Sequence, residues 1–178
     1  MPRPPRLLLA AAVLLGLGQA ADAACTDAAA PAAQWRRCLL DGADLSGANL
    51  AGADLRDSSF KRSEMRGAIL TTVQGRRAKF VSSGLQDVDF SGADLVQADF
   101  TSADLTGAKL VGASLRSARL FQANLRGADL TDAVLEGADL LRTDFSGARW
   151  VDGRTICAEG SIDRCHPGPG TVDSKVQG

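Results

Sequence analysis

The feature that most constrains this chain is a period of five residues. In "ADLSGANLAGADL" (43–55), three leucines fall five apart, and an alanine precedes each of them by two positions. Counted from Leu40 to Trp150, every fifth residue is apolar except Gly75. The pattern fills 23 consecutive pentapeptides, residues 38–152, without an insertion. The position two before each central residue is small in nearly every unit; the exceptions include Cys38, Val73, Val88 and Thr143.

Neither regular secondary structure explains this period. Five residues turn an α-helix by about 500°, so successive apolar residues would step about 140° around it and form no face. In a continuous strand, an odd period would place them on alternating faces. Within one unit, however, the small and the central residue are two apart and point the same way in an extended segment. Pairs such as "SG", "AG", "RD" and "TD" then supply turns. The sequence therefore predicts a coil of short extended sides with a continuous core.

A correlation at spacing 20 favours four sides in each coil. Phe60, Phe80 and Phe100 are 20 apart and would stack on one face. The residues just before the centres alternate in charge along two faces, as stacked neighbours prefer. These two series are Lys79, Asp99, Arg119 and Asp139, and Asp89, Lys109, Asp129 and Arg149.

The unit A(D/N)LxG resembles the pentapeptide repeat family. The resemblance implies an all-β fold, a right-handed quadrilateral β-helix, in which the central residue and the small residue two before it face inward. With four units per coil, the repeats 38–152 make about 5.75 coils. Gly75, with Val73 in the small position, departs from the pattern. We therefore consider a local bulge or a short outward loop near residues 71–77.

A solenoid needs caps, because each end exposes an unpaired edge and an apolar cross-section. We expect an N-terminal cap at 24–37 and a C-terminal disulfide cap at 153–165, with Trp35 and Trp150 covering the two ends. Four cysteines in an exported chain imply disulfides with three possible connectivities. A rod about 28 Å long, at roughly 4.8 Å per coil, keeps its two ends too far apart for a disulfide. The pairs left are Cys25–Cys38 and Cys157–Cys165.

The two termini are expected to lie outside the folded domain. Two arginines, an apolar stretch at 7–18 and the small residues "ADA" predict a signal peptide, 1–23, that is cleaved near Ala23. The alternatives are a lipoprotein with a lipidated Cys25 and an uncleaved membrane anchor. Cleavage implies a periplasmic or secreted protein with no membrane span in the mature form. Residues 166–178 are expected to form a flexible tail.

No motif predicts catalysis, a metal site or a cofactor. His166 is the only histidine and has no evident partner for nucleophilic or acid–base chemistry. The repeat explains the aspartates at 89, 94, 99 and 104 better than calcium binding or carboxylate catalysis does, since each precedes a central residue. We expect a protein that is not an enzyme and has no small-molecule substrate.

Charge is uneven along the repeats, although the formal net charge is only -1. Residues 61–79 hold six Lys and Arg against one acid, and residues 87–104 hold five Asp and no base. One interpretation is a basic patch for an anionic partner. The other is a solvated surface on which adjacent coils neutralise one another.

The residues that follow the centres on the phenylalanine side suggest a contact surface. Val81, Thr101, Phe121 and Leu141 are apolar or β-branched and would stack in adjacent coils. They could bind a partner or a second copy, or simply suit an exposed strand row.

We therefore expect a non-enzymatic exported repeat scaffold that mediates protein–protein interaction or has a structural role in the cell envelope. The alternative that the family implies is a DNA mimic that protects a topoisomerase. A signal peptide and a repeat region with 16 acids and 13 bases oppose that alternative. We accordingly expect no nucleic-acid partner and an unidentified protein partner or self-association.

Overall fold

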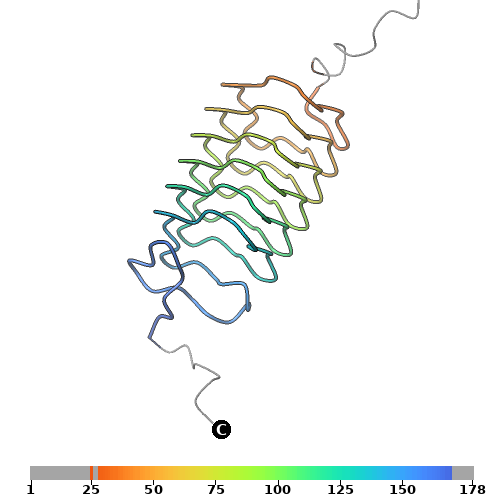
Figure 1. Cartoon of the computed structure of the whole chain (residues 1–178). Helices are drawn as coiled ribbons and strands as arrows, with labels where there is room; N and C mark the ends of the chain where they lie inside the picture. The colour runs from red at the N-terminus through yellow and green to blue at the C-terminus, as the bar shows by residue number, and fades with distance from the viewer. Residues whose placement is uncertain (1–24, 26–27, 170–178) are drawn as a thin grey trace, which may run out of the picture.

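The chain winds into a stack of four-sided coils (Figure 1). A computed structural model describes Cys25 and residues 28–169. Consecutive coils are joined by parallel bridges between residues 20 apart, from Gln34↔Asp54 to Asp129↔Arg149. Each side contributes one bridged residue rather than a longer strand. The spacing of 20 confirms four pentapeptides per coil.

Main-chain hydrogen bonds hold each coil to its neighbours. The amide of a central residue donates to the next coil, as in Phe80 N to Asp99 O at 2.7 Å. The amide just before a central residue donates to the previous coil, as in Lys79 N to Ser58 O at 2.9 Å. Polar backbone groups are therefore satisfied along the rod, and the interior is left to side chains.

The core contains the two inward residues of each unit, as the period predicts. In the middle of the rod, central residues such as Leu95 and Leu110 and small residues such as Ala98 and Ala113 are 0% exposed. The stacked phenylalanines are also confirmed. Ring centroids of Phe60 and Phe80 lie 5.2 Å apart and those of Phe80 and Phe100 lie 5.0 Å apart, with interplanar angles of 8°.

Each corner is a tight turn with a left-handed residue in its second position. The amide of Ala43 donates to Leu40 O at 3.2 Å, and the same bond recurs at the other corners. The second turn residue has a φ between +54° and +71° in every unit from Arg37 to Gly147, which identifies type II turns. Glycine suits this position, and Thr72 (φ 55°) strains it, because a β-branched side chain disfavours positive φ.

The Asp or Asn before many central residues stabilises the turn that follows. Asp89 Oδ1 accepts a hydrogen bond from Ser91 N at 2.9 Å, and Asp104 Oδ1 accepts one from Thr106 N at 3.1 Å. Burial opposes ionisation of Asp104, but hydrogen bonds from Thr106 and Gln86 outweigh it and lower the pKa of this carboxyl. These carboxylates therefore have a local structural role.

The bulge considered at residues 71–77 does not form. Gln74 bridges both Asp54 and Asp94, and the amide of Gly75 donates to Asp94 O at 2.8 Å, as a central residue should. A Cβ at Gly75 would meet Leu95 Cδ2 at 2.8 Å. The leucine of the next coil thus reaches into the space that a larger central residue would occupy, and the coil keeps its course.

The coil begins one unit earlier than the sequence pattern indicates. Trp35 N donates to Asp54 O at 2.9 Å, and Trp35, 2% exposed, occupies a central position. Its ring lies 6.5 Å from that of Phe60. Trp35 is therefore part of the first described coil, and the estimate of about 5.75 coils, counted from residue 38, leaves out this side.

The C-terminal end is covered by a segment that runs antiparallel to the last coil. Asp144 bridges Ile162, and Arg149 bridges Ile156. Amides that would otherwise point to a further coil donate to this segment, as in Phe145 N to Ser161 O at 2.8 Å. This pairing removes an open sheet edge, a common site of aggregation.

The ordered C-terminal segment extends beyond the boundary expected at Cys165. His166 N donates to Ser161 Oγ at 3.1 Å, Pro167 bridges Cys157, and Gly168 N donates to Ile156 O at 2.9 Å. The prediction that a flexible tail begins at 166 is therefore wrong for 166–168, because these residues pair with the cap. Residues 170–178 of the predicted tail lie outside the described residues, as does the proposed signal peptide, 1–23.

The cysteines lie in two local pairs at disulfide distance. Cys25 and Cys38 have Cα atoms 5.5 Å apart, and Cys157 and Cys165 have Cα atoms 5.0 Å apart. Each pair links a terminal segment to a residue of the same end of the rod. At the N-terminal end, Leu40, Leu45 and Ala48 are only partly buried by the described residues.

The inward register predicts a sharp contrast between two adjacent positions. Leu110→Asp should lower the free energy of unfolding by several kcal/mol, because it places an unpaired carboxylate in the core. Val111 is a turn residue that reaches the surface, so Val111→Asp should change the free energy of unfolding by about 0.5 kcal/mol or less. Chemical denaturation of both variants measures the difference, and equal losses would contradict the register.

Relief of turn strain provides a second test. Thr72→Gly should raise the free energy of unfolding by about 1 kcal/mol, because glycine adopts positive φ without a steric penalty. Thr71→Gly is the matched control in the same turn. Thr71 lacks a positive φ, so its replacement should lower stability by about 0.5 kcal/mol. Denaturation midpoints that shift in the same direction in both variants would contradict this account.

Candidate interaction surface

One side of the rod carries the residues that the sequence singled out for contact. We call it the phenylalanine face, after the central residues Phe60, Phe80 and Phe100. The turns that follow this face carry Val81, Thr101, Phe121 and Leu141, which we call the corner row. The turns that precede it carry Arg36, Arg56, Arg76 and Arg116, which we call the arginine row.

The four residues of the corner row lie one above another in consecutive coils. Ser82 N donates to Thr101 O at 2.9 Å, Ser102 N donates to Phe121 O at 2.9 Å, and Gln122 N donates to Leu141 O at 3.0 Å. The structure therefore brings the four predicted residues together in a single line.

The side chains of the corner row are accessible in their last two coils. Leu141 is 54% exposed, and Phe121 is half-buried. The guanidinium carbon of Arg142 lies 5.9 Å from the centroid of the Phe121 ring, within cation–π range. The Thr101 hydroxyl donates a hydrogen bond to Asp99 at 2.6 Å, so its proton is not available to a partner at this row. The result is an apolar line with an aromatic residue beside a cation.

The other corners of the described coils differ in chemistry from the corner row. The equivalent positions at the next corner carry mostly polar or charged residues, and those at the following one carry small or β-branched residues without an aromatic. These two rows are Ser46, Arg66, Gln86, Thr106, Arg126 and Ser146, and Ala51, Thr71, Ser91, Val111, Thr131 and Val151. Among the described corners, the corner row alone contains an aromatic side chain.

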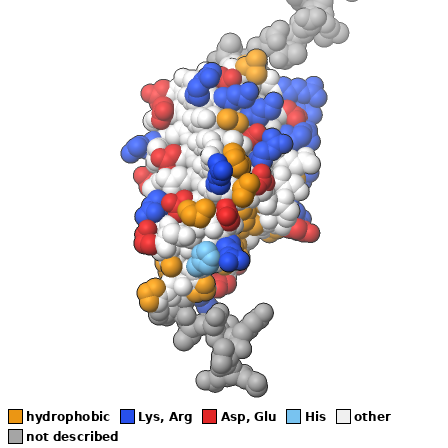
Figure 2. Space-filling view, turned by 60° about the vertical axis from the view of Figure 1, so that its left-hand side comes forward, with side chains coloured by type: hydrophobic (Ala, Val, Ile, Leu, Met, Phe, Trp, Pro, Cys, Tyr) orange, Lys and Arg blue, Asp and Glu red, His pale blue; other side chains and the backbone are white. Residues whose placement is uncertain are grey.

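The basic stretch 61–79 is divided among several corners. Lys61 and Arg62 lie in the turn one coil before the corner row, whereas Arg76 and Arg77 form a turn at the corner of the arginine row. Of the basic residues in this stretch, Arg76 alone pairs with an acid of 87–104, Asp94, at 2.5 Å. Figure 2 shows Lys and Arg side chains gathered toward the end of the rod where the chain begins. Neutralisation by the adjacent acidic stretch is therefore incomplete.

The arginine row was not predicted, although spacing 20 contains the signal. Arg36, Arg56 and Arg76 recur at that interval, and Arg116 follows after Val96. Arg56 pairs with Asp54 at 2.5 Å, and Arg116 pairs with Glu136 at 3.4 Å.

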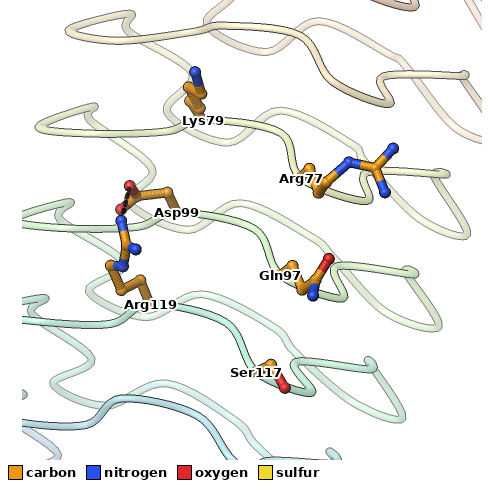
Figure 3. A pocket seen from close by; sticks show the side chains of 6 residues that line it. All are labelled: Arg77, Lys79, Gln97, Asp99, Ser117 and Arg119. Atoms are coloured by element: carbon orange, nitrogen blue, oxygen red, sulfur yellow. Dashed lines mark hydrogen bonds and ion pairs between the residues drawn. The ribbon is translucent and has the colours of Figure 1, made fainter.

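A groove of about 340 Å³ lies between the arginine-row corner and the middle of the phenylalanine face (Figure 3). Two columns of side chains line it, one in the turns and one in the sides: Arg77, Gln97 and Ser117, and Lys79, Asp99 and Arg119. The lining thus contains three cations, one carboxylate and two neutral polar groups.

Two of the three cations in the groove are in ion pairs with described residues, and the third, Lys79, is not. Arg77 donates to Asp57 in the preceding coil at 2.6 and 3.0 Å, and this hydrogen bonding lowers the pKa of the Asp57 carboxyl. Arg119 pairs with Asp99 at 3.3 Å. Lys79 bridges Asp99 through the main chain, but it forms no ion pair with any described residue. In Figure 3 its ammonium group points away from Asp99.

The remaining candidates from the sequence have structural partners. His166 Nε2 lies 3.1 Å from Arg164 Nε, and its main chain pairs with the cap. Within the residues that the structure describes, no three His, Cys, Asp or Glu side chains form a group that could hold a metal ion. The same part of the chain contains no helix long and apolar enough to cross a membrane.

Comparison with known proteins identifies the repeat. The family model for pentapeptide repeats matches residues 36–73, 85–120 and 113–149, in 8 copies. A search of curated proteins found no match.

Solved structures provide the second comparison. One match is HetL, a pentapeptide repeat protein involved in heterocyst differentiation regulation from the cyanobacterium Nostoc sp. strain PCC 7120. HetL is 31% identical to this chain, with a TM-score of 0.50. The match covers 70% of this chain and 62% of HetL. QnrB1, a plasmid-mediated fluoroquinolone resistance protein, is 24% identical over 63% of this chain and 60% of its own, with a TM-score of 0.39. A pentapeptide repeat protein from the Arabidopsis thaliana thylakoid lumen is 28% identical over 64% and 69%, with a TM-score of 0.31. The matches thus span less than two thirds of HetL and of this QnrB1 chain, a trypsin-treated variant.

Proposed function

Because this chain belongs to the pentapeptide repeat family, whose members fold as right-handed quadrilateral β-helices, we propose that it is a non-enzymatic exported scaffold that mediates protein–protein interaction in the cell envelope. Members of this family are generally repeat proteins without catalytic activity. The observation that carries the proposal is the corner row, an accessible apolar line on a rigid rod.

The geometry of the corner row supports recognition of a partner through this line. Exposed apolar residues with an aromatic among them are typical anchors of protein interfaces. Four residues at roughly 4.8 Å per coil make a line about 15 Å long. A line of this size can form the centre of an interface, and neighbouring polar residues such as Arg142 and Gln122 would form its rim.

The charge distribution does not favour the DNA-mimic alternative. A mimic of duplex DNA needs dense negative charge along the rod. Residues 28–79 instead carry nine Lys and Arg against five Asp and Glu, whereas residues 80–152 carry six against eleven. Nearly half of the described rod thus has the wrong sign for this function.

Export is proposed from the N-terminal sequence and is consistent with the cysteine pairs. Disulfides persist in oxidising compartments. We expect the mature protein to begin near Ala24 and to occur in the periplasm or the medium. N-terminal sequencing of protein from fractionated cells measures this. Intact Met1 on protein from the cytoplasmic fraction, with reduced cysteines, would contradict export.

The corner row predicts a specific loss of association. Phe121→Ser combined with Leu141→Ser should keep the fold, because both residues lie outside the inward positions, and should weaken self-association or partner capture. Sedimentation and an affinity pull-down from envelope extract measure the effect. Val111→Ser, at the equivalent turn position of another corner, is the matched control. If the double variant sediments with the same mass and captures the same proteins as the wild type, the corner row is an ordinary exposed β surface and not a contact site.

A further inference from the structure

We propose that the groove lined by Arg77, Lys79, Gln97, Asp99, Ser117 and Arg119 binds a linear acidic polysaccharide through its carboxylate and hydroxyl groups. This inference does not rest on the corner row, which lies on the opposite corner of the phenylalanine face.

The groove selects an anion. Its lining has three cations and one carboxylate, and that carboxylate, Asp99, is already paired with Arg119. Lys79 has no ion-pair partner among the described residues and carries uncompensated charge on the rim of the groove. Arg77 and Arg119 are each in one ion pair, but their side chains are 56% and 66% exposed, so both keep N–H donors from which a ligand carboxylate can accept hydrogen bonds.

The neutral residues of the groove select a ligand with hydroxyl groups. The side chains of Gln97 and Ser117 have no hydrogen-bond partner in the part of the chain that the structure describes. Both can donate and accept hydrogen bonds. No apolar side chain lines the groove, so it offers nothing to an acyl chain.

The main chain disfavours an extended peptide as the occupant. Arg77 N donates to Val96 O, Gln97 N to Arg116 O, and Asp99 N to Ala78 O, at 2.9 to 3.0 Å. Backbone groups along the groove are thus used between coils and cannot pair with an added strand. An acidic peptide would therefore gain no main-chain pairing with the rod, whereas an acidic glycan can place its hydroxyl groups on the side chains of Gln97 and Ser117.

The surroundings favour a polymer over a single sugar. The two columns cross three consecutive coils along the axis of the rod (Figure 3). Beyond the groove the same corner carries Arg76 and Arg56, which pair with Asp94 and Asp54, and Arg36, which forms no ion pair with a described residue. A linear chain with an acidic group on successive sugars can follow this track and gain contacts from several coils.

The test measures binding of oligogalacturonate to the folded protein by isothermal titration calorimetry. Lys79→Gln and Lys79→Glu should weaken binding by about tenfold or more, the effect of losing one charge-assisted hydrogen bond. Lys109→Gln and Lys109→Glu are the matched controls. Lys109 occupies the same position in its unit on another face, lacks an ion pair among the described residues and lies outside the groove. The controls change the net charge equally and should leave binding within about twofold of wild type.

A third variant should act in the opposite direction. Asp99→Asn removes the only acid of the groove and keeps the oxygen that accepts Thr101 N at 3.0 Å, so oligogalacturonate should bind more tightly. Neutral dextran, polyglutamate and phosphatidylglycerol vesicles are the comparison ligands. No binding of oligogalacturonate, equal losses in the Lys79 and Lys109 variants, weaker binding by the Asp99 variant, or equal or tighter binding of any comparison ligand would each overturn the proposal.

Discussion

The main-chain hydrogen bonds between coils are the interaction on which the rest of this structure depends. Each side has one bridged residue, and in the inner coils that residue pairs with the positions 20 before and 20 after it. The pairing repeats along the whole rod, so it fixes the register of every unit relative to the coils on either side. It also fixes which residues are inward, because the central residue and the residue two before it must share a face.

The sequence predicted the core because the core repeats, and it failed where a unit has an unusual residue. Gly75 suggested a bulge, since an isolated glycine offers no apolar side chain to the interior. The structure keeps the coil regular because Leu95 from the next coil lies close to the vacant position. Trp35 lies in a central position, but the unit around it lacks the A(D/N)LxG pattern, so its place in the first coil was not predicted. The antiparallel pairing of 166–168 has no period and could not be found from spacing.

The surface was less predictable than the core, because outward positions are not constrained by packing. The corner row was predicted, since spacing 20 gathers Val81, Thr101, Phe121 and Leu141 into one line. The groove was not predicted, because it combines two columns, one in turns and one in sides, and a spacing of 20 does not indicate that two columns border one hollow. Likewise, the two series of alternating charges along the faces predict which signs are neighbours, but not which of two neighbours forms the ion pair. Asp99 has Lys79 above it and Arg119 below it, and only the orientation of the side chains shows that it pairs with Arg119.

The same constraint explains how a regular fold can carry two different surfaces on one face. Inward positions are restricted to small and apolar residues, whereas the residue before each centre and the two turn residues are free to vary. On the phenylalanine face, these free positions give an apolar line at one corner and a polar, cationic groove beside the other. A substitution such as Lys79→Gln or Phe121→Ser changes one of these surfaces without touching an inward residue. The hydrogen bonds between coils do not involve these outward side chains, so a coil can change its binding chemistry and keep its shape. The corner row and the groove can therefore be altered separately, and the two proposals are independent of each other.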